Sequence, residues 1–159
     1  MNSMGTAVVT LPSSTQILIS REFAAPRHLV YRAWTTPELI RRWWSGRRGE
    51  VTSIEVDLRV GGKWRYVMTA NAGFEVAFHG EYREIVTDER LVSTEVFEAM
   101  PDSQAVSTLV LTESGGRTTV NLLIDHTTQD ERDLHLAYGM EGGMQEALDQ
   151  LEEVARSLA

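Results

Sequence analysis

The sequence predicts an α+β fold in which one curved antiparallel sheet of about six to seven strands surrounds a long carboxyl-terminal helix. Six strand-like segments follow one another between residues 51 and 126 with mostly short connections. A further strand-like segment at 16–23 is followed by two short helix-like segments, and an amphipathic helix ends the chain. A single sheet must cover its apolar face, and only the terminal helix is long enough to do so.

Length and composition indicate one domain at 16–159, preceded by a flexible tail at 1–15. A chain of 159 residues suits one domain. The tail lacks a basic stretch followed by an apolar core, and no apolar run approaches the roughly 20 residues of a membrane span. We therefore expect a cytoplasmic protein. The formal charge of −8 and the lack of cysteine argue against nucleic-acid or membrane partners and against disulfides.

The amino-terminal part predicts a strand and then two short helices. Residues 16–23, "QILISREF", alternate apolar and polar side chains as a half-buried strand does. In "APRHLVYRAW" Pro26 suits the first turn of a helix. In "TPELIRRWW" Thr36 is a candidate N-cap with Pro37 at the first helical position, which predicts a second helix that continues through the two tryptophans.

The central part predicts a meander of six strands. Glycine-containing turns at 61–62, 71–73 and 114–116 separate several of them, which is typical of hairpins. The predicted strands are 51–57, 63–70, 74–86, 90–98, 106–113 and 117–126.

The last part predicts one helix from about residue 130 to 158, roughly 40 Å long at 1.5 Å per residue. Thr128 and Glu131 have the spacing of a capping box. From Met140 onward the apolar residues occupy one face. Gly139 and Gly143 lie at the edge of this face. They favour a bend or a close crossing of the helix, with a ligand portal as the alternative, whereas Gly142 is expected on the solvent side.

Alternation along the strands predicts which side chains point toward the helix. On 74–86 the opposite register would bury charges such as Glu75 and Glu81. Large aromatics and methionine suit a ligand pocket, although the same lining is also typical of a plain core. The candidate ligand-binding residues are Trp43, Trp44, Trp64, Tyr66, Met68, Phe74, Phe78, Tyr82, Leu109, Leu122, Met140 and Met144.

The charged residues and the search for catalytic motifs identify no reaction. Arg41 and Arg47 are candidate anchors for an anionic group, against the alternative of a solvated helix end. No metal-ligand spacing, nucleophile elbow, P-loop or dinucleotide fingerprint is present, so the sequence predicts neither a metal nor a cofactor. Tyr66 and Tyr82 are the only inward-facing candidates for acid–base chemistry.

Five segments in order resemble the START-like SRPBCC superfamily, in the branch named after the activator of the 90-kDa heat-shock-protein ATPase. The resemblance covers about 16 to 157 and implies the helix-grip fold with a deep apolar cavity. Met140 stands where many relatives have tryptophan, and Ser45-Gly46-Arg47 stands where Gly-Pro is common. The segments are "REFAAPRHLVYRAWTTPELIRRWW", "DLRVGGKWRYVM", "FHGEYREIVTDERLVSTEVFE", "TLVLTESGGRTTVNLLI" and "GMEGGMQEALDQLEE".

The resemblance leaves several functions open, because superfamily members include lipid carriers, hormone receptors, cyclases and oxygenase subunits. The first expectation is binding of a small apolar or amphipathic ligand in the cavity. The second is an enzyme that uses the same cavity for cyclisation, dehydration or hydrolysis. The third, a co-chaperone-type interaction domain with a chaperone partner, is less favoured because residues 1–15 are too short for the chaperone-binding domain of the eukaryotic activators.

Overall fold

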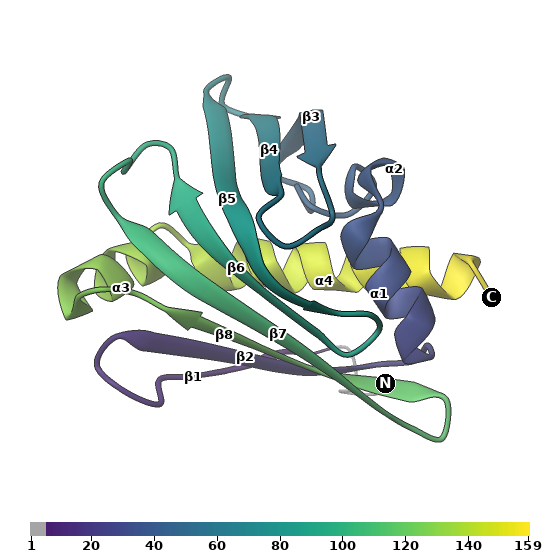
Figure 1. The fold of residues 1–159 in the computed structure, drawn as a ribbon. Coiled ribbons are helices and arrows are strands. Elements are labelled where there is room, and N and C mark those ends of the chain that lie inside the picture. Colours follow the sequence, from purple (N-terminus) through teal and green to yellow (C-terminus); the bar gives the residue numbers. More distant parts are fainter. Residues whose placement is uncertain (1–5) are drawn as a thin grey trace.

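The protein is built from one eight-stranded antiparallel sheet and four helices within residues 6–159, the part of the chain that this computed structural model describes (Figure 1). The strands are β1 (Val8–Thr10), β2 (Gln16–Phe23), β3 (Gly49–Val56), β4 (Lys63–Ala70), β5 (Glu75–Val86), β6 (Arg90–Phe97), β7 (Gln104–Ser114) and β8 (Arg117–Asp125). The helices are α1 (Arg27–Thr35), α2 (Pro37–Ile40), α3 (Gln129–Ala137) and α4 (Met140–Ser157).

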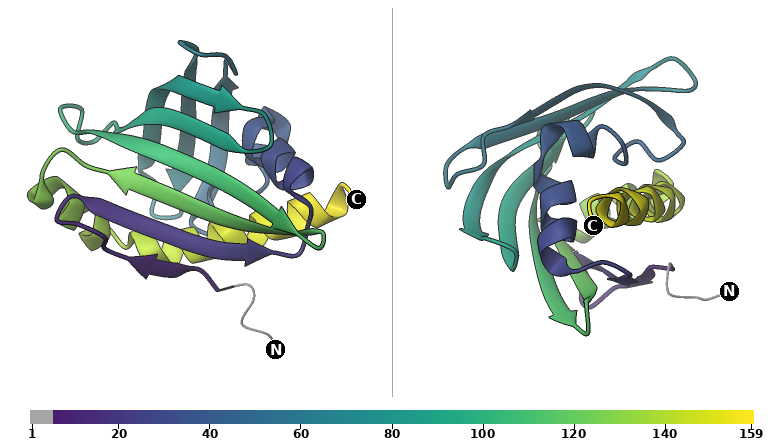
Figure 2. Two further views of the ribbon diagram at one scale, coloured as in Figure 1. Left: turned by 60° about the horizontal axis from the view of Figure 1, so that its bottom comes forward. Right: turned by 90° about the vertical axis from the view of Figure 1, so that its right-hand side faces the viewer.

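The sheet has the strand order β1-β2-β8-β7-β6-β5-β4-β3. The strands from β3 to β8 form the predicted meander, and β2 joins it by pairing with β8. The chain therefore passes from one side of the sheet to the other between β2 and β3, and α1 and α2 make this connection (Figure 1). Viewed along α4, the sheet curves around the helix on one side (Figure 2).

Two interruptions of the strand register accompany this curvature. One lies between Val51 and Ser53 in the pairing of β3 with β4, and the other between Tyr82 and Glu84 in the pairing of β5 with β6. An extra residue in one strand bends it and increases its twist. The sheet can therefore turn around α4 while its concave face stays continuous.

The core lies where the second half of α4 packs onto the sheet and α1. Leu151 of α4 and Ile17, Ile19 and Phe23 of β2 are almost fully buried. At this end Arg21 of β2 reaches α4 and places its guanidinium 3.1 Å from carboxylate oxygens of both Asp149 and Glu152. The Arg21 side chain is 1% exposed whereas that of Asp149 is 61% exposed, so these ion pairs join the helix to the sheet at the border of the core.

The terminal helix is interrupted, whereas the sequence predicted one continuous helix. Gly139 has φ +78°, in the left-handed region that glycine adopts without steric cost, and separates α3 from α4. The predicted bend is thus present, at Gly139. Gly143 lies inside α4 with open space in front of it, so it marks no close crossing.

Two further expectations need correction. Residues 8–10, assigned to a flexible tail, form β1 and pair with β2, which gives eight strands instead of six or seven. The prediction for residues 1–5 lies outside the described residues. The helix predicted through the two tryptophans ends at Ile40, and Trp43 and Trp44 lie in the turns that follow α2. Within residues 6–159, every helix is too short or too polar to cross a bilayer.

Candidate functional site

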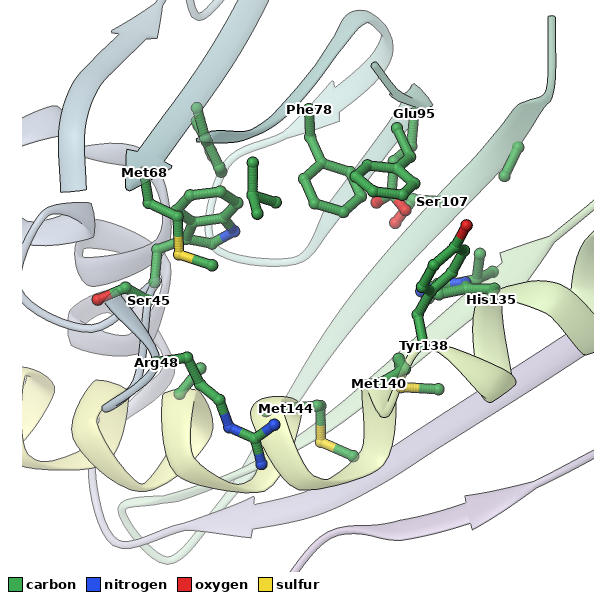
Figure 3. A pocket seen from close by; sticks show the side chains of 18 of the residues that line it. Ser45, Arg48, Met68, Phe78, Glu95, Ser107, His135, Tyr138, Met140 and Met144 are labelled. Carbon is green, nitrogen blue, oxygen red and sulfur yellow. The ribbon is translucent and has the colours of Figure 1, made fainter. Parts of the chain in front are cut away.

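A cavity of about 680 Å³ lies between the concave face of the sheet and the first half of α4. The central strands supply most of the walls, and Met140 and Met144 of α4 form part of the opposite side (Figure 3). Aromatic and aliphatic side chains dominate this lining. The wall residues of β4, β5 and β6 are Trp64, Tyr66, Met68, Ala70, Val76, Phe78, Tyr82, Leu91, Ser93, Glu95 and Phe97.

The structure brings together all the predicted ligand-binding residues except Leu109. Leu109 pairs with Leu122 of β8 and Leu91 of β6 in the sheet, but it is 3% exposed and packed into the core instead of lining the cavity. Phe74 lies just before β5 and is 60% exposed, so it borders the cavity instead of closing it. The others that line the cavity are Trp43, Trp44, Trp64, Tyr66, Met68, Phe78, Tyr82, Leu122, Met140 and Met144.

The aromatic rings form a connected row across the sheet. Trp44 contacts Tyr66 and Phe78 edge-on, with ring centroids 5.4 and 5.9 Å apart. Phe78 stacks on Phe97 at 5.0 Å, and Phe97 meets Tyr138 edge-on at 5.6 Å. Such offset and edge-on pairs are favourable beyond the area that they bury, so this wall is organised before any ligand arrives.

The two adjacent tryptophans both line the cavity but differ in burial. Trp43 is 5% exposed, and its indole N–H donates to the carbonyl oxygen of Ala33 at 2.9 Å. Trp44 is half-buried against the row of rings. Trp64 packs beside Gly80, its partner across β4 and β5, where a Cβ atom would lie only 2.7 Å from the indole nitrogen.

Neither predicted anion anchor, Arg41 or Arg47, lines the cavity. Arg48, which is exposed as they are, is the arginine among the described lining residues. Its guanidinium lies 3.3 Å from a carboxylate oxygen of Glu146, and this contact lowers the pKa of that carboxyl. The Arg48 Nη2 atom lies 2.7 Å from where a Cβ of Gly142 would be. Gly142, expected to face solvent without such a contact, therefore makes room for Arg48.

Glu95 is an acidic group in the cavity that the sequence analysis missed. Burial raises the pKa of its carboxyl to about 7, and the side chain lines the cavity from β6. Burial also raises the pKa of Tyr66 and of Tyr82, so both phenols stay neutral near pH 7. The pairing of Phe97 with Phe78 places Glu95, two residues away, on the same concave face, and this register is not apparent from the sequence alone.

A pair of histidines lies at the same end of the cavity. His126 follows β8, and its Nε2 lies 3.0 Å from Nδ1 of His135 in α3. Burial lowers the pKa of both rings, that of His135 to about 4. Of the two hydrogen bonds of the predicted capping box, one is present: the backbone N–H of the nearby Glu131 donates to the Thr128 hydroxyl. The side-chain Oε1 of Glu131, which would form the other, is buried with no partner among the described residues.

The arrangement is suited to holding a molecule. It offers apolar walls, a carboxyl group that can exist in both protonation states near neutrality, and neutral hydroxyl and imidazole groups. Within residues 6–159, no three histidine or acidic side chains converge closely enough to hold a metal ion. The titratable groups inside can therefore form hydrogen bonds or transfer protons to a bound molecule.

Comparison with known proteins agrees with this architecture. A protein of Rhodobacter sphaeroides is 25% identical over 95% of this chain and 99% of its own, with a TM-score of 0.87. A Nitrosomonas europaea protein is 27% identical over 93% and 98%, with a TM-score of 0.83. A Chromobacterium violaceum protein is 26% identical over 90% and 98%, with a TM-score of 0.76.

Comparison with proteins of curated function gave no match. The model of the family described as "Activator of Hsp90 ATPase homolog 1-like protein" matches residues 24–156, which include α1, every strand from β3 to β8 and nearly all of α4. The sequence resemblance to this branch of the START-like proteins is thereby confirmed, and the chain belongs to the Activator of Hsp90 ATPase homolog 1-like family.

Proposed function

We propose that the protein binds a small apolar or amphipathic molecule in the cavity between the sheet and α4. The observation that carries the proposal is the cavity itself, about 680 Å³ with aromatic and methionine walls. Small-molecule sites occupy roughly 300–1,000 Å³ and combine apolar walls with a few polar groups. Ordinary protein cores contain few voids larger than a water molecule, so a plain core does not account for this space.

Intrinsic fluorescence provides a direct test, because all four tryptophans of the chain line the cavity. We expect naphthalene, dodecanol or 4-phenylbutanol to change the tryptophan emission in a saturable way and to raise the melting temperature. Isothermal titration calorimetry gives the affinities. A panel of apolar and amphipathic molecules that left emission and melting temperature unchanged would contradict the proposal.

A matched pair of variants locates the binding. Met144→Trp adds bulk inside the cavity, so we expect it to weaken binding in calorimetry by about tenfold or more. Leu134→Trp adds the same side chain to α3 at a position that is 43% exposed and outside the cavity lining. This control should bind as the unmodified protein does. Equal affinities of the two variants would place the ligand elsewhere.

Acid–base catalysis in the same cavity is the second candidate, and Glu95 is the observation that favours it. A carboxyl with a pKa of about 7 can both donate and accept a proton at neutral pH. The test is incubation of bound molecules followed by mass spectrometry. Conversion by the unmodified protein that is lost in Glu95→Gln would support catalysis. If neither protein converts the bound molecules, binding is the only function that remains supported.

A further inference from the structure

The two ends of the cavity differ in charge. Glu95, Ser107, Tyr138 and His135 gather at one end, while Arg48 and Met68 lie toward the other (Figure 3). Arg48 already has an acidic partner in Glu146 outside the cavity. The first end is here called the acidic end, because it holds the carboxyl groups of Glu95 and Glu131 and no arginine or lysine among the described lining residues.

The other groups that face Glu95 leave its charge unbalanced. Tyr66 on β4 and Tyr82 on β5 stay neutral near pH 7 because burial raises their pKa values. His126 and His135 stay neutral because burial lowers theirs. Above pH 7 the acidic end therefore carries net negative charge, and a charge in an apolar site with no cationic side chain among the described lining residues beside it costs free energy.

Aromatic rings stand beside this charge. Phe97 is on the same face of β6 as Glu95, with Phe78 stacked on one side and Tyr138 edge-on. In Figure 3 the hydroxyl of Tyr138 points toward the side of the cavity where Glu95 lies. Aromatic faces attract cations through their negative quadrupole, and a nearby carboxylate adds a charge-assisted hydrogen bond.

We propose that the acidic end receives the ammonium group of an apolar amine, whose hydrocarbon or aromatic body fills the remainder of the cavity. This inference rests on the proposed ligand-binding function and adds the chemistry of the ligand's polar group. An ammonium group would supply the positive charge that the described lining residues of this end do not offer. A carboxylate at the same end would be repelled, and a neutral hydroxyl would leave the charge uncompensated.

Three probes with the same body and different heads test the inference. They are 4-phenylbutylamine, 4-phenylbutanol and 4-phenylbutyrate, each titrated into the full chain at pH 7.5 by calorimetry. We expect the amine to bind about tenfold tighter than the alcohol, and the carboxylate to bind most weakly. Glu95→Gln should abolish the preference for the amine, so that the amine and the alcohol bind this variant with similar affinities. Glu75→Gln, on the exposed part of β5, should keep the preference.

The pH dependence provides a readout that needs no variant. The amine stays protonated between pH 6 and pH 8, while Glu95 ionises across this range, so amine affinity should rise with pH and alcohol affinity should not. If the alcohol binds as tightly as the amine, the inference is wrong and the proposed function stands. If no probe binds and the wider apolar panel is also inactive, both proposals are wrong. A preference for the amine that persists in Glu95→Gln would show that Glu95 does not bind the ammonium group, and the inference would be wrong.

Discussion

Glu95 makes the folded protein less stable at alkaline pH. Its pKa rises from 4.5 in an unfolded chain to about 7 in the cavity, so folding favours the protonated form. The folded state binds more protons than the unfolded state between these values, and stability therefore falls as the pH rises from about 4.5 to 7. A carboxyl group that opposes folding in this way is typical of a residue kept for binding or chemistry.

Replacing this carboxyl should stabilise the protein. We expect Glu95→Gln to raise the free energy of unfolding at pH 8 by about 1–3 kcal/mol, because the amide cannot ionise. At pH 4.5 the two proteins should differ much less. Urea denaturation at both pH values measures the effect. A variant no more stable than the parent at pH 8 would show that the carboxylate is well solvated in the cavity.

The sequence alone could not assign Glu95 because its strand is ambiguous. In 90–98, Leu91 and Phe97 lie on one face while Val92 and Val96 lie on the other, so alternation favours neither. The register with β5 resolves it through the pairing of Phe97 with Phe78. On β5, by contrast, the face opposite Phe78 and Tyr82 is polar or small from residue 75 to 83, which is why these two residues were predicted correctly to line the cavity.

At the level of elements, the glycines of the terminal helices have separate structural roles. Gly139 supplies the left-handed backbone between α3 and α4. Gly142 leaves room for the guanidinium of Arg48. Gly143 lines the cavity with open space in front of it. Only the first of these roles follows from a sequence pattern, since the other two depend on what the fold places opposite the helix.

Alanine substitutions should separate these roles. Gly139→Ala should destabilise the protein by about 1–2 kcal/mol, because a Cβ disfavours φ +78°. Gly143→Ala should stabilise it by about 0.5–1 kcal/mol, because it removes glycine from a helix interior without a clash. Thermal and urea denaturation measure both. The same sign for the two variants would contradict this assignment.

The strand pattern was predicted well where hydrophobic alternation is strong. The bounds of β2 and β4 agree with the sequence, and those of the other predicted strands differ by at most two residues at either end. β1 escaped detection because three residues cannot establish a period, and its pairing with β2 depends on the assembled fold. The end of α2 at Ile40 was missed because Trp43 packs against Trp34 and Ala33, tertiary contacts that override the local helix pattern.

For the molecule as a whole, two opposing titrations contribute to the pH dependence of stability between pH 4 and 7. The folded state holds His126 and His135 neutral by lowering their pKa values below the usual 6.5. Their contribution is complete above pH 6.5 and is lost as the pH falls toward the His135 value of about 4. Glu95 acts in the opposite direction over an overlapping range, so the profile of the unmodified protein should be shallow.

The variant His135→Gln separates the two contributions. It removes one titration, so its stability should depend less on acid than that of the parent between pH 6.5 and 4.5. His28→Gln, at an exposed position of α1, is the control and should follow the parent profile. Chemical denaturation across this range measures the slopes. A slope unchanged in His135→Gln would mean that the histidine pair contributes nothing to acid sensitivity.

The amino-terminal segment is connected to the wall of the cavity. The backbone N–H of Ala7 donates to the side-chain oxygen of Gln145, and the Gln145 amide donates to the Ala7 carbonyl, at 3.0 and 2.8 Å. Gln145 is the neighbour in sequence of Met144, which lines the cavity. The position of the segment around Ala7 and that of α4 beside the pocket are therefore coupled through Gln145, so titrations of this protein should use a chain in which residues 6–10 are intact.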